Sequence, residues 1–160
     1  MNQSRRREES FKRLFMAQFY PDDQFDDVLK SSDELERLDW DSDARPYIEP
    51  ELGNGIKPSD LKLINDKVMA IREHIDQIDD ILNSCMEGWK TSRLSKVDLT
   101  VLRLAVYEIR FDDRIPVKVS INEAVELAKK YGTEKSGGFV NGVLRRVAES
   151  EPGLDSSKAE

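Results

Sequence analysis

Residues 95–111 constrain the fold more than any other part of the chain, because their apolar side chains cover nearly the whole circumference of a helix. The apolar positions are Val97, Leu99, Val101, Leu102, Leu104, Ala105, Val106 and Ile109. A helix of this kind is expected at the centre of a helical domain, wrapped by other helices. Ser95 and Asp98 have the spacing of a capping box, which predicts that the helix begins there.

The chain before this segment carries further helical patterns. The first places four large apolar side chains on one face and ends at Pro21: Phe11, Leu14, Phe15 and Phe19. An acidic helix is predicted within 22–38, followed by a long acidic loop over 39–58 that is interrupted by Pro and Gly. Residues 59–84 alternate apolar steps of four and three, which fits one long helix or two shorter ones that meet near His74.

Small and polar residues mark the helix boundaries that follow. Gly88 is expected to close the preceding segment, with Trp89 packed behind it. Ser120 and Glu123 repeat the capping-box spacing and predict the start of the next helix. Gly132 is expected to end that helix in a left-handed conformation.

The last predicted helix opens at Phe139, after a polar connector over 133–138. The tail, 151–160, is expected to be disordered. No strand-like alternation competes with the helical patterns in the sequence. The chain is therefore predicted to be all-α, with about six or seven helices in a single domain over 1–150.

The net charge of −7 is unevenly distributed along the 160 residues. Residues 22–51 hold twelve acidic side chains against three basic ones. By contrast, residues 1–13 hold five basic and two acidic side chains, and residues 129–146 hold five basic and one acidic side chain. An acidic total is therefore compatible with a basic surface that binds nucleic acid.

The residues that catalysis or metal binding would need are scarce. His74 is the single histidine and Cys85 the single cysteine, and the sequence has no Gly-rich phosphate loop. We therefore expect a protein that is not an enzyme and that holds no metal or cofactor. No apolar run approaches the roughly 18 residues needed to span a bilayer, and Lys12 and Arg13 interrupt the first hydrophobic stretch, so a cytoplasmic location is expected.

Three consecutive arginines near the N-terminus, Arg5, Arg6 and Arg7, precede the first predicted helix. Because guanidinium groups bind phosphate bidentately and stack on bases, residues 1–8 could form a flexible RNA clamp. A merely solubilising tail would have the same composition. From the residues alone the chain is a helical bundle with a possible nucleic-acid surface.

Several long motifs in the C-terminal third resemble one family. From Leu94 the chain reads Leu-Ser-Lys-Val-Asp-Leu-Thr-Val-Leu-Arg-Leu-Ala-Val-Tyr-Glu-Ile, then Ile115-Pro116, then Ser-Ile-Asn-Glu-Ala-Val-Glu-Leu-Ala-Lys-Lys-Tyr-Gly from Ser120, and Phe-Val-Asn-Gly-Val-Leu from Phe139. This order closely resembles the NusB family of bacterial transcription antitermination proteins. The resemblance implies two packed helical subbundles.

It also implies binding to boxA-type single-stranded RNA from ribosomal RNA leaders, together with NusE, the small-subunit ribosomal protein that doubles as a transcription factor. Other Nus factors and RNA polymerase would be indirect partners, and a homodimer is compatible with the family. The nearest alternatives are the NusB-like domain of ribosomal RNA cytosine methyltransferases and a protein-only scaffold whose arginine arm binds an acidic partner.

The resemblance also suggests site residues. Arg5, Arg6 and Arg7 correspond to the family's RNA-binding arm, and their joint replacement by Ala is expected to weaken RNA binding with an unchanged fold. Lys118 and Phe139 resemble positions that face RNA.

Asp98 resembles an acidic position at the NusE contact, although it could simply cap its helix. Phe139 could equally fill the core, and Lys118 could simply be solvated. Lys135 departs from relatives, which often carry an acid there, and it should add attraction for phosphate.

Overall fold

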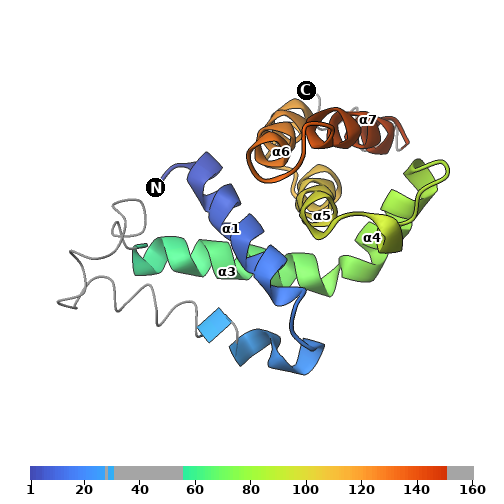
Figure 1. Cartoon of the computed structure of the whole chain (residues 1–160). Coiled ribbons are helices and arrows are strands. Elements are labelled where there is room, and N and C mark those ends of the chain that lie inside the picture. The colour runs from blue at the N-terminus through green and yellow to red at the C-terminus, as the bar shows by residue number, and fades with distance from the viewer. Residues whose placement is uncertain (28, 31–55, 151–160) are drawn as a thin grey trace. The chain divides into compact units, whose positions relative to one another are not determined.

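The computed structural model describes residues 1–27, 29–30 and 56–150, and its regular structure over these ranges is helical throughout (Figure 1). The elements are α1 (Gln3–Ala17), the short 3-10 helix η1 (Asp22–Gln24), α3 (Pro58–Glu73), α4 (Ile75–Cys85), the 3-10 helix η3 (Thr91–Arg93), α5 (Lys96–Phe111), α6 (Val117–Tyr131) and α7 (Ser136–Glu149). The predicted all-α class is confirmed. No helix in these ranges combines the length and apolar character that a bilayer crossing requires.

The chain divides into two compact units, Met1–Met69 and Ala70–Glu160, and the division falls inside α3. Most of the predicted acidic helix, the loop predicted over 39–58 (apart from 56–58) and the tail 151–160 lie outside the described residues. Residues 25–27 and 29–30 are helical.

Helix α5 is the centre of the second unit, as its apolar circumference predicted. It contacts α4, α6 and α7, between which it lies in Figure 1. Val101, Val106 and Ile109 are completely buried. The predicted N-cap is present, since the Ser95 hydroxyl accepts a hydrogen bond of 3.1 Å from the backbone N–H of Asp98.

The segment 59–84 forms two helices, with the break at His74. This residue has φ −103° and ψ 11°, outside the helical values of its neighbours. Its ring Nδ1 lies 2.8 Å from the carbonyl oxygen of Ala70, so Nδ1 must be the donor. The backbone N–H of His74 also reaches this carbonyl, at 3.3 Å. A side chain that competes for a carbonyl of the helical ladder is a recognised cause of a helix break.

The residues predicted to begin and end α6 do not act in the predicted way. The helix starts at Val117, after Pro116, so Ser120 is an interior residue rather than an N-cap. Its hydroxyl instead donates a hydrogen bond of 2.9 Å to the buried carboxylate of Glu108 on α5. Gly132 has φ −98°, which is not left-handed. Glycine fits here because a Cβ would lie 2.7 Å from the carbonyl oxygen of Ala128.

Helix α7 begins at Ser136, earlier than the predicted start at Phe139. The Ser136 hydroxyl accepts a hydrogen bond of 3.0 Å from the backbone N–H of Thr133, which stabilises the turn before the helix. Gly137 is buried, and a Cβ there would lie 3.2 Å from Cγ of Lys129. The close approach of α6 and α7 therefore explains the glycine at position 137, whereas a Cβ at Gly138 would meet no atom within 4 Å.

The hydrogen bond between Ser120 and Glu108 should contribute to stability, because a buried carboxylate that loses a donor has no water to replace it. We expect Ser120→Ala to lower the free energy of unfolding by about 1–3 kcal/mol in urea titrations followed by circular dichroism. Ser84→Ala is the matched control, since Ser84 is exposed. Its hydroxyl donates a 2.7 Å hydrogen bond to the carbonyl oxygen of Ile81 and lies 3.7 Å from Sγ of Cys85, both in its own helix. Equal losses in the two variants would contradict this role for Ser120.

Candidate nucleic-acid interface

The three N-terminal arginines lie in the first turns of α1, so the expected flexible arm over residues 1–8 is wrong from residue 3 onward. The helix starts this early because Asn2 caps it: its side-chain oxygen accepts a hydrogen bond of 2.8 Å from the backbone N–H of Arg5. Asparagine is a preferred N-cap residue, so Asn2 was a signal in the sequence for this early helix start. Arg5, Arg6 and Arg7 are therefore held on a helix.

Arg6 connects α1 to α3 within the first unit. Its Nη1 lies 3.4 Å from a carboxylate oxygen of Asp60 and donates a 2.7 Å hydrogen bond to the carbonyl oxygen of Met1. The Met1 ammonium group lies 3.9 Å from the same carboxylate. Because Asp60 is buried in the first turn of α3, this pair is better shielded from solvent than a surface ion pair.

Arg7 is 4 % exposed, whereas Arg5 is only half-buried. A buried guanidinium cannot serve as an accessible phosphate clamp in this conformation. The sequence could not distinguish the three arginines, because they are adjacent and chemically identical. The structure therefore separates them: Arg5 is half-buried, Arg6 is paired with Asp60 and Arg7 is buried.

The remaining predicted RNA residues belong to the second unit. Lys118 is exposed in the first turn of α6, and Lys135 is exposed at the N-terminal boundary of α7. Neither ammonium group has an ion pair with another residue of the described ranges. Since a helix rises 1.5 Å per residue, Lys118 lies about 20 Å along α6 from the turn that carries Lys135. The two cations would therefore contact separate parts of an extended ligand.

Phe139 lies one helical turn after Lys135 and is half-buried, so it is neither a pure core residue nor a fully exposed one. Its ring packs edge-to-face on Trp89, with centroids 6.0 Å apart and an interplanar angle of 63°. The structure thus joins Lys135 and Phe139 on one part of α7 and adds Trp89 to them.

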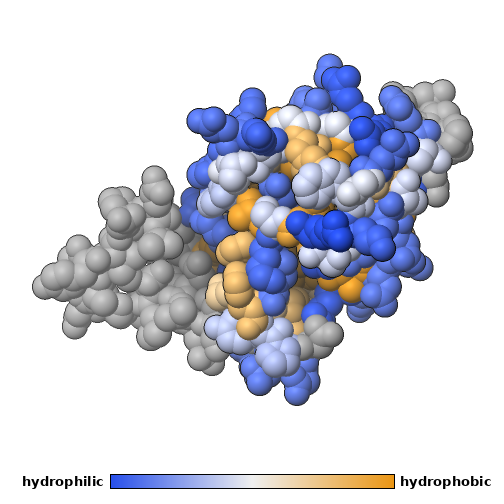
Figure 2. All heavy atoms as spheres, turned by 45° about the vertical axis from the view of Figure 1, so that its right-hand side comes forward, coloured by the Kyte–Doolittle hydropathy of each residue, from blue (hydrophilic) through white to orange (hydrophobic). Residues whose placement is uncertain are grey.

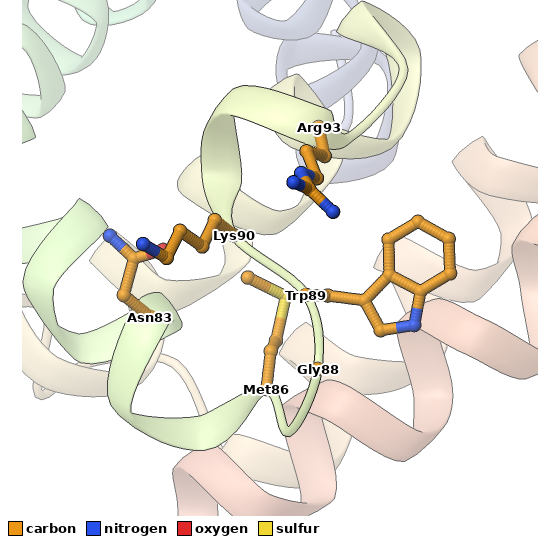
Figure 3. Close-up of a pocket in the computed structure, with 6 residues that line it drawn as sticks. All are labelled: Asn83, Met86, Gly88, Trp89, Lys90 and Arg93. Carbon is orange, nitrogen blue, oxygen red and sulfur yellow. The ribbon is translucent and has the colours of Figure 1, made fainter.

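Trp89 was expected behind the preceding helix, but it is 52 % exposed, which corrects that expectation. It belongs to a hollow of about 580 Å³ lined by Asn83, Met86, Gly88, Trp89, Lys90 and Arg93 (Figure 3). The signal in the sequence was the order Gly-Trp-Lys, an aromatic residue directly after a turn and beside a cation. On the face that Figure 2 shows, hydrophilic side chains separate the apolar patches.

Asp98 is half-buried in the first turn of α5. Its Oδ1 is buried and has no hydrogen-bond partner within the described part of the chain. Its position near the helix N-terminus is favourable for a negative charge. An acceptor that burial separates from water is nevertheless costly unless a donor reaches it.

Other ionisable groups lie outside these surfaces. Burial, and then the neighbouring Asp112 carboxylate, raises the pKa of Tyr107 above its ordinary value. The hydrogen bond from Arg114 to Asp112, with Nε and Oδ1 3.0 Å apart, raises the pKa of the guanidinium. Within 1–27, 29–30 and 56–150, no group of His, Cys, Asp or Glu side chains could hold a metal ion.

Comparison with known proteins decides the family. A sequence model of the NusB family matches residues 5–149. The chain belongs to the NusB family. The transcription antitermination protein NusB of Agathobacter rectalis is 45% identical over 150 residues, which cover 92% of this chain and 100% of that protein. The corresponding protein of Lachnoclostridium phytofermentans is 42% identical, with 88% and 94% covered.

Solved NusB structures share the fold. NusB of Thermotoga maritima superposes with a TM-score of 0.69 at 34% identity and covers 94% of this chain and 93% of its own. The crystal structure of NusB and NusE in complex with dsRNA matches with a TM-score of 0.66, covering 94% and 100%, but at 24% identity it supports the fold alone. The predicted family, fold and function in transcription antitermination are confirmed.

The burial of Arg7 argues against the expectation that the arginines of this NusB-family protein can be replaced without affecting the fold. We expect Arg7→Ala to lower the free energy of unfolding by about 1–3 kcal/mol, because it removes a packed and buried side chain. Arg5→Ala, two residues earlier in the same helix and half-buried, is the control and should cost less. Urea titrations measure the free energy of unfolding of both variants. Equal values for the two would contradict a structural role for Arg7.

Proposed function

We propose that this NusB-family protein binds boxA-type single-stranded RNA of ribosomal RNA leader transcripts jointly with NusE. In this role it carries no catalytic activity, acts in the cytoplasm and connects indirectly to other Nus factors and RNA polymerase. The observation that carries the proposal is the surface of α7, where the half-buried Phe139 follows the exposed Lys135 by one turn.

The chemistry of this surface suits a single strand better than a duplex. An exposed ammonium group attracts phosphate, whereas an accessible aromatic ring offers a stacking surface to an unpaired base. Lys118 supplies a second cation on α6, and Arg5 supplies one on α1. Each of these cations is a local positive charge in a chain whose net charge is −7.

Asp98 supports a protein partner on the second unit. A donor from NusE would satisfy the buried Oδ1 that has no partner among the described residues. Because the backbone N–H of Asp98 is already bonded to Ser95, the carboxylate is not required for that cap. Its side chain can therefore serve recognition without loss of the N-cap.

RNA binding should depend on Lys118 and Lys135 as individual phosphate contacts. We expect Lys118→Gln and Lys135→Gln each to weaken binding of a boxA RNA and to lower the slope of log K against log salt by about 0.7. Fluorescence anisotropy with boxA and scrambled RNA, with and without NusE, measures this. NusE should raise the affinity for boxA RNA over the scramble.

Lys62→Gln is the matched control, because Lys62 is an exposed lysine already paired with Asp66 at 2.8 Å. It should leave both affinity and slope unchanged. If all three lysine variants behave alike, the two proposed contacts are wrong. If NusE brings no preference for boxA RNA, the proposed function itself is wrong.

Partner binding should depend on Asp98. We expect Asp98→Ala to weaken NusE binding about tenfold in isothermal titration calorimetry, since the new hydrogen bond would be lost. Asp76→Ala is the control, because Asp76 is likewise an acidic residue in a first turn, that of α4, but it is exposed. Both variants lose the same favourable interaction with a helix N-terminus. An equal effect of the two on NusE binding would remove Asp98 from the interface.

A further inference from the structure

The turn between α4 and η3 is built to display Trp89. Met86 anchors it in the core with 5 % exposure, and Gly88 reverses the chain at φ +76°, a conformation that favours glycine. Asn83 then holds the far side, since its side-chain oxygen accepts a 2.9 Å hydrogen bond from the backbone N–H of Thr91. An indole presented on so constrained a turn loses little freedom when a ligand covers it.

The hollow beside this indole is positively charged. Lys90 and Arg93 line it, and its lining includes no acidic side chain. Neither cation has an ion pair with a residue in the described part of the chain. In Figure 3 the guanidinium of Arg93 extends to the side of the turn on which the indole lies, while Lys90 extends to the other side, near Asn83.

The hollow is continuous with the RNA surface described above. Trp89 and Phe139 are in edge-to-face contact. An edge-to-face pair covers at most one face of the indole, so the other face remains available to a stacked base. With 52 % of the residue exposed, the indole has room for a stacked ring. A strand that crosses Phe139 would therefore meet Trp89 next.

We propose that the hollow is a further nucleotide site of the RNA surface: an unpaired base stacks on Trp89, and Arg93 and Lys90 bind phosphates on either side of the turn. This inference rests on the proposed function, which it extends beyond Lys135 and Phe139. Stacking on an aromatic side chain tolerates any base, so the site adds affinity and register more than sequence preference. The planar guanidinium group of Arg93 can donate two parallel hydrogen bonds to one phosphate.

A protein partner is the competing occupant, because Trp and Arg are also common at the centres of protein interfaces. Two observations favour RNA. The lining carries two cations without an opposing acid, and the indole adjoins Phe139 rather than an isolated apolar patch. NusE binding measured without RNA distinguishes the two occupants.

The fluorescence of Trp89 tests the stacking directly. The chain has two tryptophans, so Trp40→Phe leaves Trp89 as the single indole. Titration of this full-length variant with boxA RNA in the presence of NusE should quench the Trp89 emission, with the same midpoint as the anisotropy titration. Emission that stays constant while anisotropy reports saturation would overturn the proposal.

Substitutions test the contribution of each group. Trp89→Leu should weaken RNA binding about tenfold, and Trp89→Phe, which keeps an aromatic face, should restore most of that loss. Lys90→Gln and Arg93→Gln should each lower the salt slope by about 0.7, as Lys62→Gln should not. Circular dichroism melting curves establish that each variant is folded before its affinity is compared.

The outcomes separate this site from the function on which it rests. If wild-type protein with NusE prefers boxA RNA and Trp89→Leu binds it equally well, the site is wrong and the proposed function stands. If Trp89→Leu instead weakens NusE binding without RNA and leaves RNA affinity intact, the hollow is a protein interface and the proposal is overturned. If wild-type protein shows no boxA preference, the proposed function fails and this inference fails with it.

Discussion

The burial of α5 is the constraint on which the second unit depends. Because its side chains are apolar on nearly all sides, the helix is stable only when α4, α6 and α7 cover it together. Its one fully buried acid, Glu108, accepts a hydrogen bond from Ser120 of α6. A buried polar contact of this kind is tolerated only where its partner is in register, so it favours one alignment of α5 and α6 over others.

The candidate binding groups lie at helix ends and turns around this core rather than within it. Asp98 and Lys118 occupy first turns, Lys135 precedes α7, and Trp89 follows the glycine turn after α4. Such positions are held by capping and packing while their side chains remain available to a ligand. In the proposed function, such positions present several weak contacts to an extended RNA.

The predictable parts of the fold were those with local causes. The apolar circumference of α5 and its Ser95 cap could be recognised from spacing alone, and the C-terminal motifs identified the family. The errors arose where a residue suits two local roles. Ser120 is a typical N-cap residue type but hydrogen-bonds to another helix. The glycines before Phe139 resemble a connector, but both are helical and Gly137 lies close to Lys129 of α6.

The sequence by itself determined that the chain is helical, that α5 is central and that the family is NusB, because periodicity and motif order are properties of neighbouring residues. Only the tertiary structure decided which of three adjacent arginines is buried, which is paired with Asp60, and that Trp89 is exposed beside Phe139. These facts depend on residues distant in the sequence, such as Asp60 for Arg6 and Phe139 for Trp89. No local pattern encodes that proximity; it exists only once the helices have packed.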